Sequence, residues 1–270
     1  MAQAQMYISP FRLWHHRALV GQLTRRMIAQ RYRGSVMGVL WSLLTPLLML
    51  TVYGLVFGVV FEARWQRSTG PQGEFAVMLF AGLILHQLFA EVITRTPTII
   101  AEHASFVRKV VFPLEILPPV IVMSSLFQWG ISCLVMLGGV VVVYGGVPLT
   151  VLWLPVVVLP LVILAVGLGW LLAALGVFVR DISQIMGVLT TLLLFFSTIF
   201  YPADALPDMV QSFVYYNPLS FIVDQVRQVV ILGDGPDVFG MLFYMAVSVV
   251  VYLVGGWWFL RTRHAFADVV

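Results

Sequence analysis

The stretch RYRGSVMGVLWSLLTPLLML, residues 31–50, passes from a basic and aromatic segment into an uncharged apolar run with Pro46 in its middle. Over residues 34–61, 28 consecutive positions lack Asp, Glu, Lys, Arg and His, which exceeds the roughly 20 residues that cross a bilayer as a helix. The run begins behind several arginines and no A-x-A-like site follows it, unlike a secretory signal. It predicts a retained transmembrane helix, weakened or kinked because Pro46 cannot donate to the carbonyl of Ser42.

The composition extends this interpretation to the whole chain. It is 61% hydrophobic and only 10% charged, with a mean hydropathy of +0.99, whereas soluble domains carry about 25% charged residues. Most of the surface is therefore expected to face lipid. We predict an all-α polytopic membrane protein with six transmembrane helices, at residues 36–61, 75–92, 116–144, 151–178, 185–201 and 238–260.

The fifteen lysines and arginines fall mostly in alternate connections between these runs. Because basic residues concentrate on the cytoplasmic side of membrane spans, we expect both termini to be cytoplasmic and the protein to be multi-pass in the cell inner membrane. Residues 1–35 would then form a cytoplasmic arm and residues 36–270 the transmembrane domain. The basic residues on the cytoplasmic side are Arg12, Arg17, Arg25, Arg26, Arg31, Arg33, Arg95, Arg108, Lys109, Arg180, Arg261 and Arg263.

The arm holds a second pattern. On a helical wheel Val20, Leu23 and Met27 share a narrow arc, with Arg25 and Arg26 nearly opposite. This predicts an amphipathic helix at residues 20–33 that lies in the inner interface on anionic lipid. An ordinary basic flank of the first span is the alternative. We expect no nucleic-acid partner, because these arginines adjoin a span and are mixed with apolar residues.

The segment between residues 201 and 238 is too long for a turn and too apolar for a solvated loop. Asn217 can cap a helix that starts at Pro218, and Gly233 can end it. Asp224 and Arg227 form an i,i+3 pair within it. We predict two short helices, at residues 206–215 and 218–232, that dip back into the outer membrane face; a packed structural cap is the alternative.

Several kinds of chemistry are not expected. The five histidines are scattered without zinc-ligand spacing, and Cys133, the single cysteine, can form no internal disulfide. Lys109 is the single lysine and no glycine-rich loop precedes it, so the chain has no P-loop. We expect no bound metal or cofactor. His86 and Glu91, near the inner end of the second span, are expected to reach the interface.

The loop RTPTIIAEHASFVRKVVFP, residues 95–113, has the length and polarity of a short surface helix. One aromatic residue, Phe106, stands among charged and polar neighbours and could enter a groove on a partner protein. An ordinary charged connector is the alternative.

Together these segments resemble the type-2 ABC exporter permeases that handle lipid-linked polysaccharides. The resemblance rests on residues 31–61, on FVRKVVFPLEILPPV at 106–120, VRDISQI at 179–185, YYNPLSFIVDQVRQVVI at 215–231 and the tail RTRHAFADVV. It is closer to O-antigen and teichoic-acid permeases than to capsule permeases.

The resemblance implies a half-transporter. Two copies of the chain would form a homodimeric twelve-span pore on two separate ATP-binding subunits, which would hold ATP and Mg. The outer-face segment at 204–233 would gate the pore, through Asn217, Pro218, Asp224 and Arg227. The segment at 101–109 would be the coupling helix that meets the ATPase, through Glu102, His103, Phe106, Arg108 and Lys109.

Spans one and five would line the conduit. Sugar rings present apolar C–H faces, so aromatic side chains can offer sliding contacts; facing lipid is the alternative role for each of them. Arg31 and Arg33 could bind the pyrophosphate of an undecaprenyl carrier, although the basic flank explains them as well. The aromatic candidates are Trp41, Tyr53, Phe57, Phe196, Phe200 and Tyr201.

The expected function is that of the permease subunit of an exporter of undecaprenyl-diphosphate-linked O-antigen, with hydrolysis of ATP by the partner. Export of teichoic acid or capsular polysaccharide is the alternative within transport. A membrane-embedded enzyme of glycolipid assembly and a non-catalytic scaffold are alternatives of other classes. The sequence does not name the sugar.

Overall fold

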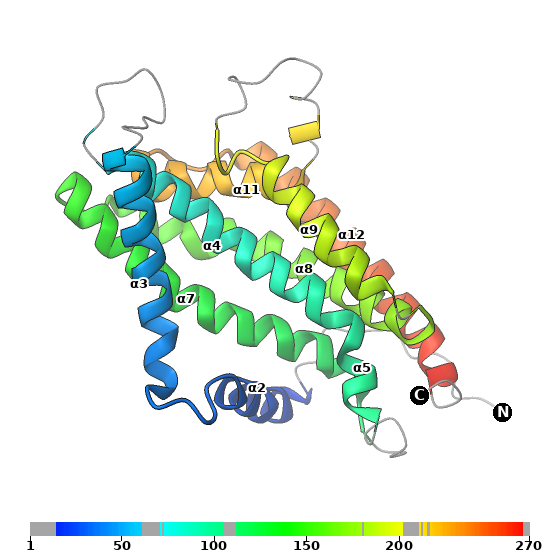
Figure 1. The fold of residues 1–270 in the computed structure, drawn as a ribbon. Helices are drawn as coiled ribbons and strands as arrows, with labels where there is room; N and C mark the ends of the chain where they lie inside the picture. Colours follow the sequence, from blue (N-terminus) through cyan, green and yellow to red (C-terminus); the bar gives the residue numbers. More distant parts are fainter. Residues whose placement is uncertain are drawn as a thin grey trace.

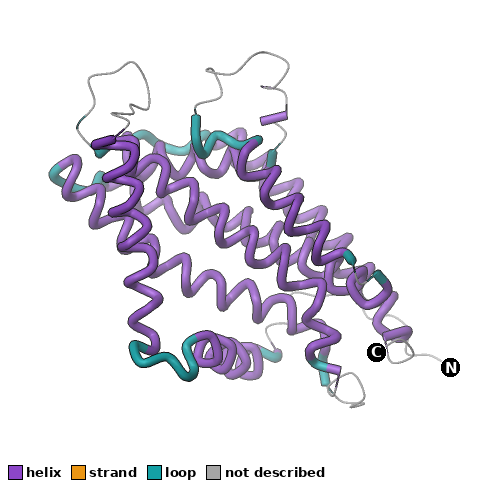
Figure 2. Tube along the Cα trace, viewed as in Figure 1, coloured by secondary structure: helices purple, strands orange, loops and turns teal. Residues whose placement is uncertain are grey.

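The computed structural model describes residues 15–60, 71, 73–104, 112–179, 181–201, 211, 213–214 and 217–266. Throughout these residues the regular structure is helical and no strand occurs (Figure 2). This confirms the all-α prediction.

Within the described ranges, five helical segments are long and apolar enough to cross a membrane. The segments are Gly38–Phe57, which contains α3 (Trp41–Tyr53); Glu74–Glu102, with α4 (Glu74–Arg95) and α5 (Ile99–Glu102); Leu114–Tyr144, with α7 (Leu117–Tyr144); Leu149–Phe178, with α8 (Leu154–Phe178); and Val238–Ala265, with α12 (Val238–Thr262). Where the fifth span is predicted, α9 (Ile182–Phe195) has only 14 residues. It rises about 21 Å, short of a hydrocarbon core of about 30 Å. The count of six spans therefore stays a prediction.

Helix α4 lies at the centre of the bundle (Figure 1). It contacts α3, α7, α8, α9 and α11, and 72% of its most apolar window is buried. The corresponding figure for α3 is 11%. Helix α4 is therefore the central helix of the core, whereas α3 packs at its edge.

Helices α8 and α12 form the closest pair. A Cβ added to Gly255 would lie 2.1 Å from the carbonyl oxygen of Gly167, so the two backbones touch. A Cβ on Gly176 would lie 2.0 Å from the carbonyl oxygen of Pro97, at the turn after α4. Small residues allow this approach, as is usual where membrane helices associate.

Helix α2 (Arg17–Arg31) lies across the end of the bundle opposite α11 (Figure 1). Gly34 and Gly38 have φ of +85° and +52°, conformations that glycine adopts readily, and they turn the chain from α2 into α3. The two predicted faces of the helix are present: Val20, Leu23 and Met27 are half-buried, whereas Arg25 and Arg26 are exposed. Its contact with a membrane stays a prediction.

The predicted helix at 218–232 is confirmed. It consists of α11 (Pro218–Arg227) and a π-helical continuation, η7 (Gln228–Leu232). Asn217 is its N-cap and Gly233, with φ of +80°, its C-cap. Ile222, Val226 and Val229 form an apolar stripe along this helix and are buried. The other predicted short helix, at 206–215, lies almost wholly outside the described residues.

Candidate functional site

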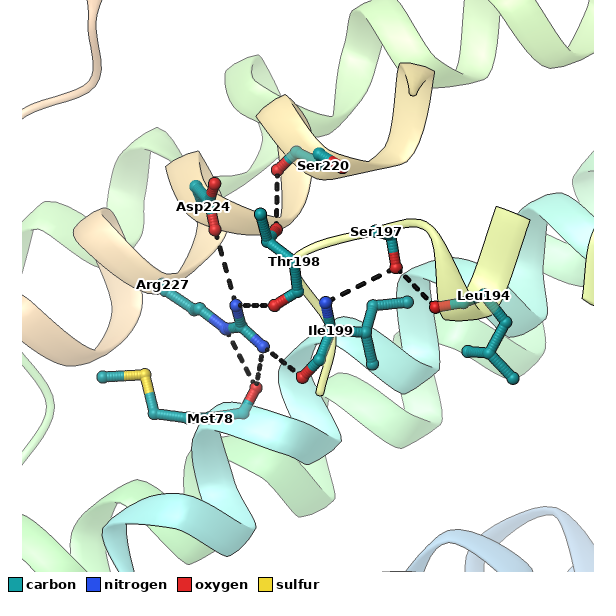
Figure 3. Close-up of polar contacts among 8 residues, drawn as sticks. All are labelled: Met78, Leu194, Ser197, Thr198, Ile199, Ser220, Asp224 and Arg227. Atoms are coloured by element: carbon teal, nitrogen blue, oxygen red, sulfur yellow. Dashed lines mark hydrogen bonds and ion pairs between the residues drawn. The ribbon is translucent and has the colours of Figure 1, made fainter. Parts of the chain in front are cut away.

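Two groups of polar side chains lie within this apolar bundle, one at the α11 end and one near α2. The first, the Arg227 cluster, joins α4, the turn after α9 and α11; its members are Met78, Ser197, Thr198, Ile199, Ser220, Asp224 and Arg227 (Figure 3).

Arg227 is 3% exposed, and its guanidinium donates five hydrogen bonds to four acceptor oxygens (Figure 3). Nε and Nη2 both donate to the carbonyl oxygen of Met78, at 3.0 and 2.9 Å. Nη1 donates to the carbonyl of Thr198 at 2.6 Å, and Nη2 to that of Ile199 at 2.9 Å. The remaining Nη1 contact is with Asp224 Oδ1 at 3.4 Å. All five N–H groups of the side chain therefore have an acceptor.

The surrounding chain makes room for this arginine. A Cβ on Gly82 would lie 3.0 Å from Ile199 and 3.3 Å from Nη2 of Arg227. In the turn after α9, the hydroxyl of Ser197 donates to the carbonyl of Leu194 at 2.8 Å and accepts from the Ile199 amide at 3.4 Å. The turn thus presents two carbonyls to Arg227, while its Ser197 hydroxyl and Ile199 amide pair with each other and with α9.

Asn217 joins two helix ends. Its Oδ1 accepts from the amide of Leu219 at 2.9 Å and so caps α11. Its Nδ2 donates to the carbonyls of Leu193 and Phe196, both at 2.8 Å, which are left without helical partners because α9 ends there. The early end of α9 and the start of α11 are therefore one structural feature.

Further side chains attach α11 to the bundle. The hydroxyl of Tyr244, on α12, donates to the carbonyl of Pro218 at 2.7 Å. The amide of Asp237 donates to Oε1 of Gln225 at 2.7 Å, and the hydroxyl of Thr150 to the carbonyl of Val229 at 2.7 Å. The structure thus brings together the four predicted gating residues, in contacts that hold α11 in place.

The second polar group supplies the hydrogen bond that Pro46 removes from α3. Because proline has no N–H, the carbonyl of Ser42 has no donor four residues on. Nε2 of Gln128, on α7, donates to this carbonyl at 2.9 Å, while Oε1 of Gln128 accepts from the hydroxyl of Tyr32 at 2.6 Å. One amide therefore links α7 to the start of α3 and to the end of α2.

Glu91 lies beside this link and pairs with two arginines. Arg31 and Arg95 both contact its Oε1, the second at 2.8 Å. His86 donates through Nε2 to the carbonyl of Thr190, on α9, at 2.9 Å. Both side chains are thus held by groups of the protein, and their approach to the membrane interface stays a prediction. Arg31, a predicted pyrophosphate ligand, is engaged by a carboxylate, whereas Arg33 is exposed.

A cavity of about 410 Å³ opens between α2, α3, α4 and α7, which we name the α3 cavity. Two of the predicted path aromatics, Trp41 and Tyr53, line it. Its other lining side chains are mostly polar or aromatic and include Arg31, Tyr32, Gln87, Glu91, Ser125, Gln128, Trp129 and Ser132.

The other path candidates form two ring groups. Phe57 stands 6.4 Å from Tyr53 and 5.3 Å from Phe75, between ring centroids. Phe200 stacks on Phe195 at 5.6 Å. Tyr201 donates to the carbonyl of Phe195, and Phe196 is 42% exposed. Helix α4 lies between α3 and α9 (Figure 1). Within one chain, the aromatic group around Phe57 and the one around Phe200 are therefore on opposite sides of α4.

Only part of the predicted coupling segment is described. In α5 and its end, Glu102 accepts from the hydroxyl of Thr98 at 2.6 Å, and Nδ1 of His103 donates to the carbonyl of Ile99 at 2.9 Å. Phe106, Arg108 and Lys109 lie outside the described residues.

Sequence reasoning missed the role of Gln128. The available signal was a glutamine within the apolar run at 116–144, where an amide needs a partner, together with a proline that leaves a carbonyl free in another span. Ser125 and Trp129 were also missed, because nothing local distinguishes them from other residues of that run.

Comparison with known proteins agrees with this architecture. The family model of the ABC-2 type transporters matches residues 18–231. The chain is 30% identical to the O-antigen export system permease protein RfbA of Myxococcus xanthus, over 95% of this chain and 96% of that protein. It is 26% identical to RfbA of Klebsiella pneumoniae, over 92% and 93%, and 26% identical to the polysialic acid transport protein KpsM of Escherichia coli, over 90% and 93%. A helical bundle with several membrane-length helices, matched over most of its length, therefore places this chain in the ABC-2 type transporter family.

Proposed function

We propose that the chain is the permease subunit of an ATP-driven exporter that moves undecaprenyl-diphosphate-linked O-antigen across the inner membrane. The observation that carries this proposal is the 30% identity to an O-antigen export permease over 95% of the chain. The bundle fits the role, because its long helices expose wide apolar surfaces suited to lipid or to other membrane helices.

A homodimer forms the conduit. Helices α3 and α9 both expose apolar side chains, among them Leu48 at 56% and Val188 at 64%. In one chain α4 separates them. A second copy related by a twofold axis brings α3 of one protomer to α9 of the other, and so combines the two aromatic groups in one wall.

The fifth span is completed by a re-entrant element. Helix α9 is too short to cross alone, and α11 turns back against its end through Asn217. This pair reaches the outer face, gives the six-span topology with both termini in the cytoplasm, and gates the conduit there.

The energy comes from two ATP-binding subunits with ATP and Mg. The chain has no P-loop. The segment at 101–109 docks in a groove of the ATPase, and α2 rests on the inner membrane surface beside it. Motion of the ATPase then reaches α3 through Tyr32 and Gln128.

Capsular polysaccharide is the second candidate substrate, supported by the 26% identity to a polysialic acid transport protein. Teichoic acid stays an alternative of the same class. The enzyme and scaffold alternatives receive no support from the relatives, which are named as transport proteins.

Deletion of the chain from its cells tests the substrate. Cells without it should lose O-antigen from surface lipopolysaccharide and accumulate the glycan inside, while the capsule remains. Loss of the capsule with intact O-antigen would instead identify a capsule exporter, and retention of both glycans would refute polysaccharide export.

Co-purification tests the partner. The chain should copurify with a P-loop ATPase, and Phe106→Ala should lower the permease-stimulated activity of that ATPase.

The double variant Tyr53→Ala and Phe57→Ala tests the glycan path, and it should lower export from an assembled complex. Phe239→Ala is the matched control, because this aromatic is 86% exposed and belongs to another helix, α12. An unchanged activity in the Phe106 variant would refute that docking site.

A further inference from the structure

We propose that the α3 cavity of each chain binds a neutral, hydroxylated sugar ring. This inference rests on the proposed export of a glycan. It assigns a binding site inside one protomer, between α2, α3, α4 and α7, separate from the conduit between two copies.

The size of the cavity suits a small ligand. At about 410 Å³ it falls within the roughly 300–1,000 Å³ of small-molecule sites. Each bordering helix turns one face to it: on α3 Trp41, Thr45, Met49 and Tyr53 recur every four residues.

Two buried donors in its wall have no partner. The hydroxyl of Ser125, a residue that is 1% exposed, and the indole N–H of Trp129 make no hydrogen bond. They are four residues apart on α7 and both line the cavity. Ser132 and Gln128, on the same face of α7, do form hydrogen bonds. The missing partners are therefore specific to Ser125 and Trp129 on this face. A ligand oxygen that reached either group would give it the acceptor that it lacks.

The rest of the wall matches a sugar ring. The aromatic rings of Trp41, Tyr53 and Trp129 offer surfaces for the C–H faces of a pyranose. The amide of Gln87 and the carboxylate of Glu91 offer polar groups for its hydroxyls.

The charges favour a neutral ligand over a phosphate. Two basic residues line the cavity: Arg31 pairs with Glu91, whose carboxylate also contacts Arg95, and His86 donates through Nε2 to the carbonyl of Thr190. An incoming anion would have to displace this carboxylate and would meet its repulsion. The α3 cavity is therefore a poor site for the pyrophosphate of the lipid carrier and a better one for an uncharged part of the glycan.

The test measures saturation-transfer NMR between the full-length chain in lipid nanodiscs and the methyl glycosides of mannose, glucose, galactose and N-acetylglucosamine. At least one glycoside should receive saturation. Ser125→Ala and Trp129→Phe should each weaken its binding at least fivefold, because the first removes the hydroxyl and the second removes the N–H but keeps a ring.

Two controls separate the cavity from general effects. Ser124→Ala removes an equally buried and unpaired hydroxyl that does not line the cavity, and Trp153→Phe changes a tryptophan that is 48% exposed elsewhere. Both variants should bind like the unmodified chain. If none of the four glycosides binds, or if the Ser125 and Trp129 variants bind as well as the controls, the proposal is overturned and the donors face water.

Export in cells distinguishes this failure from that of the proposed function. If the unmodified chain exports glycan but the cavity variants neither lose binding nor slow export, only the sugar site is refuted. If glycosides bind at Ser125 and Trp129 but cells without the chain keep their surface glycans, the export function fails and the site stands.

Discussion

The Arg227 cluster and the α3 cavity both gather polar side chains inside an apolar bundle. Arg227 itself is fully paired, although the neighbouring Ser220 hydroxyl is not, whereas the cavity wall leaves two donors unpaired. All five N–H groups of Arg227 have acceptors, and the side chain is 3% exposed. In the cavity Gln128 is paired on both sides, whereas Ser125 and Trp129 are not. The paired guanidinium joins three segments of the chain, whereas the unpaired donors lie in residues that border a void, where a ligand could pair with them.

The largest expected effect comes from breaking the Arg227 cluster. Arg227→Met removes the side-chain donors to three buried carbonyls and should lower the free energy of unfolding by about 3–5 kcal/mol. Arg227→Lys should recover little, because an ammonium lacks the planar fork that reaches Met78, Thr198 and Ile199 together. Denaturant titration in micelles measures this. Arg25→Met, on the exposed face of α2, should change the value by less than about 0.5 kcal/mol.

The junction of α9 and α11 gives the next effect. Asn217→Asp keeps the acceptor for Leu219 but loses both donors to Leu193 and Phe196, at an expected cost of about 1–3 kcal/mol. The matched change is Asp237→Asn at the start of α12, where only the acceptor is used. It should be nearly neutral, since Asn and Asp cap equally well. Equal losses in the two variants would show that the Nδ2 contacts contribute nothing.

A double-mutant cycle tests the link at Pro46. Gln128→Leu leaves the carbonyl of Ser42 without a donor and should cost about 1–2 kcal/mol. Pro46→Ala restores a backbone N–H four residues after Ser42. In that background the loss from Gln128→Leu should be smaller by about 1 kcal/mol, and additive losses would contradict the link.

The smallest expected change in stability comes from comparing two serines, one with an unpaired hydroxyl and one with a hydrogen-bonded hydroxyl. Ser125→Ala removes an unpaired hydroxyl and should leave the unfolding free energy within about 0.5 kcal/mol of the original. Ser197→Ala removes a hydroxyl that both donates and accepts, and should cost about 1–2 kcal/mol. A large loss of stability in the Ser125 variant would show that this hydroxyl is structural, which would undo the contrast between the two groups.

Local patterns predicted much of this structure. The uncharged run at 34–61 predicted a membrane helix, and Asn217, Pro218 and Gly233 predicted the helix at 218–232 within the observed bounds. These features depend on neighbours in sequence: apolar run length, a capping side chain and a glycine with positive φ.

The sites depend on contacts that a sequence pattern does not show. Arg227 was paired with Asp224, three residues away, yet its shortest bonds reach Met78 and Thr198 on other segments. Likewise α9 stops at Phe195 because Asn217, more than twenty residues later, satisfies its last carbonyls. The observed end of α9 therefore coincides with a tertiary contact that the apolar run at 185–201 does not show.

The backbone contact between Gly167 and Gly255 also limits how the transporter can move. Two helices that touch without side chains between them have no layer of rotamers to shear, so we expect α8 and α12 to move together. Helix α3, packed along one side and hinged at Gly34 and Gly38, has no such constraint. Each cycle of transport would then be a displacement of α2 and α3 against a stationary half, with the α3 cavity widening or closing at the boundary.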